Sequence, residues 1–417
     1  MGSESTAHGV DSAPWRCSMT KQTGRGSLLE VLAVFGRLGL TSFGGPVAHL
    51  GYFRQEFVER RRWLDERSYA DIVALCQFLP GPASSQVGIA VGIKRAGILG
   101  GIAAWFGFTI PSAIALILFA YRVTAIGDVS DAGWLHGLKV VAVAVVGLAV
   151  WGMARTLCPD LPRATMAIVA AVALLAWQTP ASQIAVIGAG GLLGWRLLRE
   201  DSDRQGSASL FPVGRTVATL CLALFTTTLI ALPLIERVVS SEPLQVFDSF
   251  FRSGSLVFGG GHVVLPLLQA EVVPPAWVTN EEFIAGYGAA QAVPGPLFTF
   301  SAYLGTILDG APTGWPGGLF ALGAIYIPSF LLVIGSAPFW DNLRAKTGFG
   351  GVMRGINAAV VGLLAAALYG PVWISAIERS EDFALALGAF GLLAFWKWPP
   401  WLVVVLSALG GQMLASI

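Results

Sequence analysis

The sequence has few charged residues for its length. Asp, Glu, Lys and Arg make up 12% of the 417 residues and apolar residues 55%, whereas a soluble domain carries about 25% charged residues. Apolar runs such as 97–121 and 133–154 have the length of about 20 residues that a helix needs to cross a bilayer. The short alternating segments of a membrane β-barrel are absent. We therefore expect an all-α polytopic membrane protein.

Motifs for metal, redox and nucleotide chemistry are also missing. The four cysteines are scattered and form no CxxC or Cys/His cluster, so we expect neither a metal site nor a disulfide. The sequence has no P-loop, dinucleotide fingerprint or haem motif, which argues against ATP-driven export, an enzyme and a cofactor. The net charge of +1 gives no nucleic-acid footprint. The polar N-terminal 27 residues lack the apolar core of a signal peptide.

The chain contains two related halves. The paired segments are FGRLGLTSFGG (35–45) with FFRSGSLVFGG (250–260), QFLPGPASSQ (77–86) with QAVPGPLFTF (291–300), and FTIPSAIAL (108–116) with IYIPSFLLV (325–333). Each half ends in two short apolar runs around a proline turn, at 164–198 and 383–416, and a spare apolar run separates the halves. We predict a cytoplasmic polar tail (1–27), a first transporter half (28–210), a linking transmembrane helix (211–240) and a second half (241–417).

The charges of matched loops have opposite signs in the two halves. Loop 51–68 has five arginines, whereas its counterpart 268–282 has no Lys or Arg and carries three glutamates. Because cytoplasmic loops are rich in Lys and Arg, this predicts an inverted-topology repeat with a cytoplasmic N-terminus. Segments 28–50 and 69–93 would then each leave and return on one side, as broken or re-entrant helices. Counting every apolar run as a membrane span gives about thirteen spans. The inversion is predicted whether the broken segments are counted as spans or as re-entrant helices.

Two matched Pro-Gly-Pro breaks interrupt the apolar sequence, at Pro80, Pro82, Pro294 and Pro296. A helix that starts inside the membrane presents free N–H groups and a positive dipole end, both of which attract anions. The breaks could also be simple kinks, and the paired FGG segments a packing seam. The predicted substrate-binding residues around the breaks are Gly44, Gly45, Gln77, Gly81, Ser84, Ser85, Gly259, Gly260, Gln291, Gly295, Thr299 and Ser301.

Charged side chains occur at matched positions inside apolar sequence. Arg37 and Arg252 could together clamp a tetrahedral dianion, or each could reach an interface from near a helix end. Lys139 is a third candidate for the anion, although its repeat counterpart is Asn357 and it could instead extend toward the interface. The candidates for proton coupling, each of which could equally be structural or interfacial, are His49, Glu56, His262 and Glu271.

These segments resemble the chromate ion transporter superfamily in its long, two-domain form. The resemblance rests on FGRLGLTSFGGPVAHLGYFRQEFV (35–58), QFLPGPASSQVGIAVG (77–92) and the second-half FGGGH and QAVPGP, and it covers about 30–375. It implies proton-driven efflux of chromate from a bacterial cytoplasm across the inner membrane, with chromate resistance. It is compatible with a homodimer. Sulfate has the same shape and charge, so a sulfate or other oxyanion transporter stays an alternative, as does a passive anion channel of the same fold.

The second half departs from the first at two places. Gly261-His262 stands where the first half has Pro46-Val47, and the serine pair that follows the first break is missing after the second. The two half-sites are therefore not expected to be equivalent, and the sequence leaves open which of them holds the ion.

Overall fold

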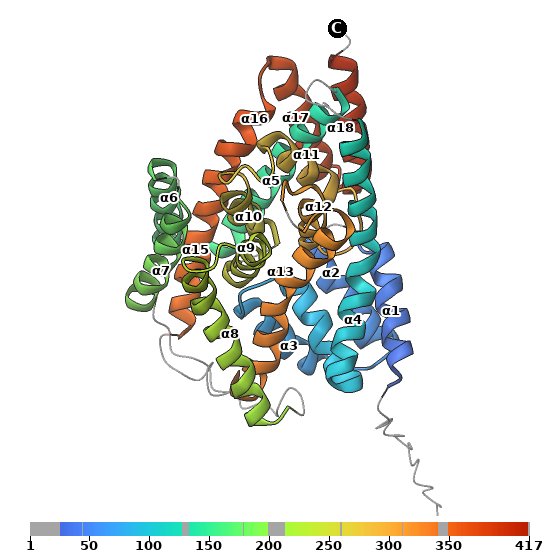
Figure 1. Ribbon diagram of the computed structural model, residues 1–417, viewed down its shortest axis with the longest axis vertical. Coiled ribbons are helices and arrows are strands. Elements are labelled where there is room, and N and C mark those ends of the chain that lie inside the picture. The colour runs from blue at the N-terminus through green and yellow to red at the C-terminus, as the bar shows by residue number, and fades with distance from the viewer. Residues whose placement is uncertain are drawn as a thin grey trace, which may run out of the picture.

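The protein is built from helices throughout the part of the chain that the structure describes (Figure 1). The computed structural model describes residues 26–43, 45–126, 133–177, 179–198, 213–258, 261–310, 312–340 and 349–415. The first half contains α1 (Leu28–Thr41), α2 (Gly45–Arg54), the π-helix η1 (Gln55–Arg60), α3 (Glu66–Phe78), α4 (Ala83–Ile126), α5 (Gly133–Leu157), α6 (Leu161–Ala176) and α7 (Pro180–Leu197). The helix α8 (Arg215–Glu236) follows. The second half contains α9 (Glu242–Leu256), η2 (Gly261–Val263), α10 (Val264–Val272), α11 (Asn280–Ala290), η3 (Leu297–Thr299), α12 (Phe300–Ile307), α13 (Gly314–Ser336), η4 (Ala337–Phe339), α15 (Phe349–Ala367), η5 (Leu368–Trp373), α16 (Ile374–Ala376), α17 (Ser380–Ala394) and α18 (Pro400–Leu414).

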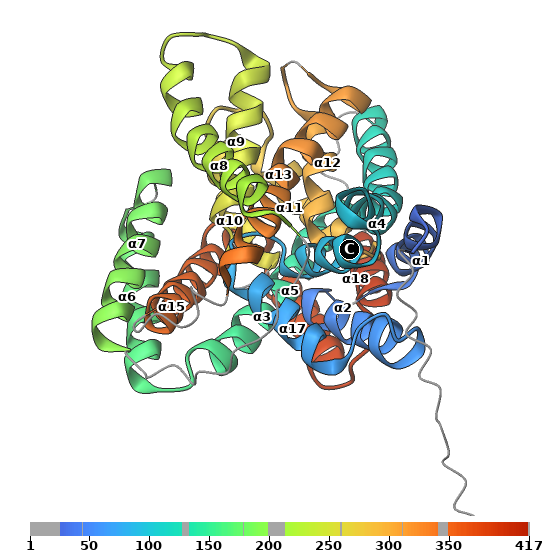
Figure 2. The same ribbon diagram turned by 90° about the horizontal axis from the view of Figure 1, so that it is seen from below.

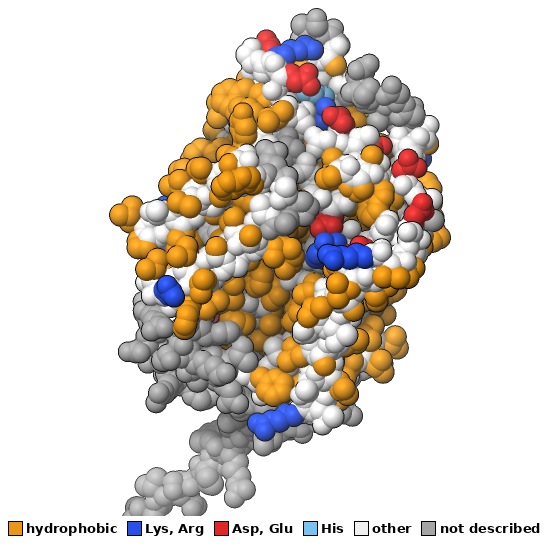
Figure 3. Space-filling model, turned by 60° about the vertical axis from the view of Figure 1, so that its left-hand side comes forward, with side chains coloured by type: hydrophobic (Ala, Val, Ile, Leu, Met, Phe, Trp, Pro, Cys, Tyr) orange, Lys and Arg blue, Asp and Glu red, His pale blue; other side chains and the backbone are white. Residues whose placement is uncertain are grey.

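The molecule has the apolar exterior of a membrane protein. Among the described residues, five helical stretches are long and apolar enough to cross a bilayer: 83–125, 133–157, 215–236, 314–339 and 350–376. Hydrophobic side chains are spread over the face in Figure 3, and the acidic side chains visible there lie in its upper half. Large apolar side chains are exposed along α8, where only lipid can cover them favourably. These features confirm the predicted polytopic α-helical class.

Helix α4 is two helices joined by a tight reversal at Ala96 and Gly97. Gly97 has φ +74°, and a Cβ atom on Gly92 would overlap the carbonyl oxygen of Gly100. The two parts, 83–95 and 98–126, therefore fold back on each other as a hairpin, and we call them α4a and α4b. The second half repeats the hairpin as α12 and α13, where a Cβ atom on Gly305 would overlap the carbonyl oxygen of Gly317.

The first half begins with two pairs of helices, α1 with α2 and α3 with α4a. Each pair runs away from one end of the molecule and returns to it. The Gly26 N–H donates to the Arg95 carbonyl (3.1 Å), and the Arg95 guanidinium contacts Glu30 at 3.1 Å. The guanidiniums of Arg61 and Arg95 lie 5.5 and 5.0 Å from the Trp63 ring centre. The start of α1, the loop before α3 and the end of α4a thus meet. At 1.5 Å per residue, α1, α3 and α4a are each about 20 Å long and α2 is about 15 Å long. All four are too short to span about 30 Å of hydrocarbon, which confirms the predicted returning helices.

The long helices that follow the breaks run in opposite directions in the two halves. Tyr121, late in α4b, accepts a hydrogen bond from the Trp315 N–H at the start of α13 (3.0 Å). Earlier in α4b, the Trp105 ring contacts the Tyr326 ring at 5.6 Å between centres. Helices α4b and α13 are repeat counterparts, and both can be followed in Figure 1. Their antiparallel packing confirms the inverted-topology repeat.

The two halves exchange their last helices. Helices α6 and α7 of the first half pack on α15 of the second, as Figure 2 shows, and α17 and α18 of the second pack on α5 of the first. The contacts run through small residues: a Cβ atom on Gly355 would overlap the Gly190 carbonyl, and one on Gly137 would overlap the Ser407 carbonyl. Small residues let membrane helices approach closely. The halves are therefore interlocked, although the sequence reads them as consecutive units.

Candidate functional site

The two Pro-Gly-Pro breaks are each bonded to the opposite half. The Gly81 N–H donates to the Val257 carbonyl (2.6 Å), and the Gly295 N–H donates to the Ser42 carbonyl (2.8 Å). Ser42 and Val257 are themselves repeat counterparts, because both follow the first helix of their half at the same offset of 215 residues. The breaks are thus related by an approximate two-fold axis and form one centre between the halves.

Matched serines from the two Ile-Pro-Ser motifs cover the breaks in the same crossed manner. Ser112 of the first half donates to the Pro294 carbonyl of the second break (2.5 Å). Ser329 of the second half lies against the first break, 2.9 Å from where a Cβ atom on Gly81 would stand. Neither serine was among the predicted site residues. Their matched position within paired motifs was the available signal.

The breaks lie where the prolines predicted them, and the first turn after the first break is buried. Helix α3 ends at Phe78 and α4 begins at Ala83, while α11 ends at Ala290 and η3 begins at Leu297. The Ser84 hydroxyl lies 3.3 Å from His49 Nδ1, and the Ser85 hydroxyl lies 3.4 Å from the Tyr326 hydroxyl. These predicted donors contact the protein in this structure, and Ser85 does so across the two halves.

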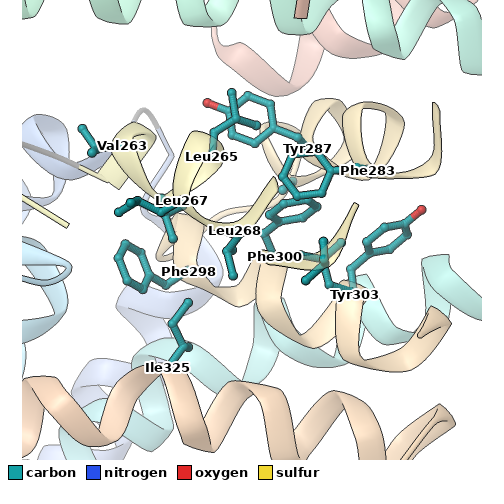
Figure 4. Close-up of a cluster of buried hydrophobic side chains, with 14 of the residues drawn as sticks. Val263, Leu265, Leu267, Leu268, Phe283, Tyr287, Phe298, Phe300, Tyr303 and Ile325 are labelled. Carbon is teal, nitrogen blue, oxygen red and sulfur yellow. The ribbon is translucent and has the colours of Figure 1, made fainter. Parts of the chain in front are cut away.

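The hydroxyls after the second break bond to main-chain carbonyls. Thr299 donates to Pro296 and Ser301 donates to Phe298, both at 2.7 Å. Figure 4 shows the aromatic side chains of this segment, Phe298 and Phe300, among the buried residues of α10 and α11. Both hydroxyls are buried next to this apolar cluster, so hydrophobic side chains pack behind the second break.

The two predicted histidines occupy different surroundings. His49 is buried, with Nε2 3.2 Å from the Ser42 carbonyl and its ring edge-on to Phe108. His262 Nδ1 lies 2.7 Å from the Tyr287 hydroxyl. The hydrogen-bond partners of each histidine are therefore those expected if it has a structural role. His49 also links the end of α1 to the start of α4 through Ser42 and Ser84.

The remaining predicted residues are placed unevenly. Gln77 is exposed on α3, and Gly45 begins α2 with φ +79°. Gly44, Gly259 and Gly260 lie outside the described residues. Gln291 is the C-cap residue of α11 and comes shortly before the second break. The two glutamines, which stand at matched positions three residues before their breaks, therefore differ in burial, as expected for inequivalent half-sites.

Several buried polar atoms around the breaks have no partner within the described ranges. They are Ser42 Oγ, Gln86 Oε1, Gln291 Nε2 and Ser329 Oγ. The Gln86 amide nitrogen donates to the Pro80 carbonyl (2.6 Å), which brings this side chain to the first break. Leaving such an atom unpaired costs about 1–3 kcal/mol, and native proteins rarely tolerate it without a water or ligand. Ser42, Gln291 and Ser329 are hydrogen-bond donors that an oxyanion would satisfy.

The matched arginines pair with the matched glutamates of their own halves. Arg37 contacts Glu56 at 2.6 Å, and Arg252 contacts Glu271 at 3.3 Å. Arg252 also forms an ion pair with Asp248, one turn earlier on α9. The structure thus gives each arginine a carboxylate partner in place of the dianion that the sequence predicted for the pair.

The two ion-pair clusters carry opposite excess charge. In the first half, Glu56 is surrounded by Arg37, Arg60 and Arg61 (2.6, 3.2 and 2.6 Å). In the second half, Arg252 alone faces several acids. Asp248, which is fully buried, and Glu271 both form ion pairs with it. Glu236 of α8 lies close enough for its charge to interact with Asp248, Glu271 and Arg252. The sequence analysis missed Asp248, although its spacing of four residues from Arg252 on one helix is a recognised ion-pair signal.

A surface hollow leads from the arginine-rich cluster toward the second break. Its volume is about 660 Å³, and its lining residues are Arg37, Leu38, Thr41, Ser42, Tyr52, Gln55, Glu56, Glu59 and Arg60. Ser42 belongs both to this hollow and to the bond with Gly295. Arg37 stands at the hollow with 46% of its side chain exposed. The hollow therefore joins a surface lined by two arginines and two glutamates to Ser42, whose buried hydroxyl has no partner among the described residues.

Known proteins resemble the chain across most of its length. A family model described as chromate transporter matches residues 29–195 and 244–412, one match for each half. A chromate transport protein of Pseudomonas aeruginosa is 28% identical over 401 residues, covering 91% of this chain and 90% of the relative. A probable chromate transport protein of Synechococcus elongatus is 24% identical, covering 94% and 96%.

A half-length relative also matches. The uncharacterized transporter YwrA of Bacillus subtilis is 29% identical over 182 residues, which is 41% of this chain and 97% of that protein. No solved structure matches the chain.

Proposed function

This chain belongs to the chromate transporter family, and on that premise we propose that it exports chromate from a bacterial cytoplasm, driven by the proton motive force. Export in this direction would confer chromate resistance. The observation that supports the proposal best is the interlocked pair of breaks, around which the buried donors of Ser42, Gln291 and Ser329 have no partner among the described residues. Discontinuous helices that meet at a repeat interface are where inverted-repeat transporters bind their substrates.

A tetrahedral dianion suits this centre. It has oxygens on all sides, so it accepts hydrogen bonds from donors that converge from both halves. The hydroxyl and amide donors at the breaks satisfy that requirement without a metal or cofactor. They would also bind sulfate, which is why the substrate is assigned through the family and not through the shape of the site.

We propose that the end of the molecule that carries Arg37, Arg60 and Arg61 lies on the cytoplasmic side of the inner membrane. Loop 51–68 and the end of α4a carry the Lys and Arg excess that marks cytoplasmic loops. The hollow beside Arg37 opens at this cluster, and its excess positive charge would attract the dianion from the cytoplasm. Gly26, the first residue that the structure describes, lies at this end, because its N–H donates to the Arg95 carbonyl, and a cytoplasmic N-terminus is part of the proposal.

Proton coupling is proposed at the acidic cluster of the second half. Asp248 and Glu271 share Arg252, and Glu236 adds a third carboxylate. Several carboxylates around one cation cannot all ionise cheaply in a low-dielectric setting, so a proton can bind and leave there. The first-half cluster has the opposite balance and would instead serve substrate entry.

Inside-out membrane vesicles should accumulate chromate against its gradient when their interior is acidified. Chromate entering such a vesicle moves in the export direction while protons leave, so a protonophore should abolish accumulation. The measurement is uptake of radiolabelled chromate, with vesicles lacking the protein as control and added sulfate as competitor. Equilibration without accumulation would identify a passive channel, and accumulation only in right-side-out vesicles would reverse the proposed direction.

A further inference from the structure

The hydroxyl groups at the two breaks differ in whether they have partners. At the second break, Ser112 and Thr299 both donate to main-chain carbonyls of the break. Their repeat counterparts at the first break are Ser329 and Ser85. Ser329 Oγ is buried without a hydrogen-bond partner among the described residues, and Ser85 Oγ makes one long contact, 3.4 Å to the Tyr326 hydroxyl. The first break therefore keeps hydroxyls whose counterparts the second break uses for its own backbone.

Ser329 stands against the backbone of the first break. Its Oγ lies 2.9 Å from where a Cβ atom on Gly81 would stand, so the lack of a side chain at Gly81 leaves room for it. The φ of Gly81, +124°, also favours glycine. A buried hydroxyl that has lost its water without gaining a partner is unfavourable, and native proteins rarely leave one without a water or ligand. Ser329 therefore indicates a molecule that binds at the first break.

A second matched pair of hydroxyls lies beside Ser329. Thr109 and Tyr326 each stand three residues before the serine of their Ile-Pro-Ser motif, so they are repeat counterparts. The Thr109 hydroxyl is buried and close enough to interact with the Tyr326 hydroxyl, but it has no hydrogen-bond partner of ordinary geometry among the described residues. Tyr326 lies one turn before Ser329 on the same face of α13. Hydroxyls from both halves therefore converge here.

The helix that starts at the first break adds main-chain donors. Helix α4a begins at Ala83, and its first main-chain bond runs from the Gln86 N–H to the Pro82 carbonyl (2.9 Å). The N–H groups before Gln86 have no acceptor inside the helix and carry the positive end of its dipole. The second break opens instead with the 3₁₀ turn η3, where the Thr299 N–H donates to the Pro296 carbonyl (3.0 Å). The first break thus offers an anion main-chain donors as well as hydroxyls.

We propose that the hydroxyls at the first break form a subsite for a tetrahedral oxyanion, together with the N–H groups at the start of α4a. The four hydroxyls are those of Ser85, Thr109, Tyr326 and Ser329. The proposal rests on the proposed transport function and deepens it, because it names the break that holds the ion. All of these donors are neutral, so the dianion is held without an ion pair and can leave again. Gln86 Oε1, the unpaired acceptor at this break, is satisfied by a water molecule beside the anion.

Anion titration of the purified full-length protein tests the subsite. Chromate and sulfate are titrated separately by calorimetry, which also shows which of the two the subsite prefers. Ser329→Ala and Thr109→Val should each weaken binding by roughly ten- to a hundredfold, the range for loss of a hydrogen bond to a charged group. The matched control is Ser336→Ala, also buried on α13, because the Ser336 hydroxyl already donates to the Leu332 carbonyl (2.6 Å). It should bind both anions as wild type does.

Melting temperature separates a binding role of Ser329 from a structural one. Because Ser329 Oγ has no partner among the described residues, Ser329→Ala should not lower the melting temperature in the absence of anion. It should instead reduce the rise in melting temperature that added sulfate causes. If Ser329→Ala does not fold, Ser329→Cys, which keeps the size but donates weakly, should show the same loss of affinity.

Wild-type affinity in both Ser329→Ala and Thr109→Val would overturn the subsite, as would no binding of either anion to wild type. Loss of affinity in Gln291→Leu with normal binding by Ser329→Ala would place the ion at the second break instead. The subsite and the proposed function fail separately. Ser329-dependent binding without accumulation in vesicles would reject proton-driven export alone, whereas normal affinity and accumulation in Ser329→Ala would reject the subsite alone.

Discussion

Replacing Gly295 with alanine is expected to reduce transport by at least about a hundredfold. Gly295 has φ +99°, which costs an L-residue about 1–2 kcal/mol. The added Cβ would overlap Ser112 Oγ, which holds the break by donating to Pro294, and would lie 3.2 Å from the Phe108 carbonyl oxygen. Overpacking adds typically 1–3 kcal/mol. Because the Gly295 N–H bonds to Ser42, the strain falls directly on the contact between the halves.

Gly81→Ala should have a smaller effect than Gly295→Ala. Its φ of +124° is also unfavourable, but the atoms that a Cβ would meet first are the ends of the Gln86 and Ser329 side chains, at 2.5 and 2.9 Å. Side-chain ends can rotate away, whereas the Phe108 carbonyl beside Gly295 cannot.

The control for both variants is Gly323→Ala on α13, where no heavy atom lies within 4 Å of the new Cβ. It should keep full transport and gain up to about 1 kcal/mol of helix stability. Vesicle uptake and melting temperature are compared at equal expression. Full transport by Gly295→Ala would show that the breaks do not need this fixed geometry.

The overall architecture could be predicted because its signals are local or simply periodic. The length of the apolar runs indicates the class, and the matched Pro-Gly-Pro segments mark the breaks. The sign of the loop charges, with five arginines in 51–68 and none in 268–282, indicates the inversion. Each of these is read along the chain without knowing which helices touch.

The crossed contacts could not be predicted, because a repeat shows which positions correspond and not which half each position packs against. Gly81 bonds to a carbonyl 176 residues away, through an N–H group that every residue except proline carries. Only the two-fold arrangement makes Val257 its partner. The exchange of α6 and α7 with α17 and α18 is hidden for the same reason, because these helices present similar apolar surfaces to either half.

The sequence patterns indicated the charged residues one at a time and not as ion pairs. Arg37 and Glu56 were both recognised as matched positions, yet one was assigned to the anion and the other to the proton. A cation and an anion that recur together in both halves are more economically explained as partners, since an unpaired charge is costly in a membrane. Ion-pair partners within a half are therefore a better first expectation than a clamp across the halves.

The matched arginines are expected to respond differently to the same substitution. Arg252→Met leaves Asp248 buried, with Glu271 beside it and no cation, and breaking a buried pair in this way costs about 3–5 kcal/mol. Arg37→Met leaves Glu56 with Arg60 and Arg61. Because Arg37 is 46% exposed, its loss should cost at most about 1 kcal/mol. Thermal unfolding of both variants in the same detergent measures the difference.

The stability lost in Arg252→Met should return when the unpaired carboxylate of Asp248 is also removed. In Arg252→Met/Asp248→Asn the buried carboxylate becomes a neutral amide of nearly the same shape, so most of the lost stability should return. Transport driven by a proton gradient should stay impaired in the same double variant, because the cluster then has neither its cation nor one of its proton-binding groups. Recovery of stability together with full proton-driven accumulation would mean that the cluster only holds α9 to α10, and that protons are coupled elsewhere in the protein.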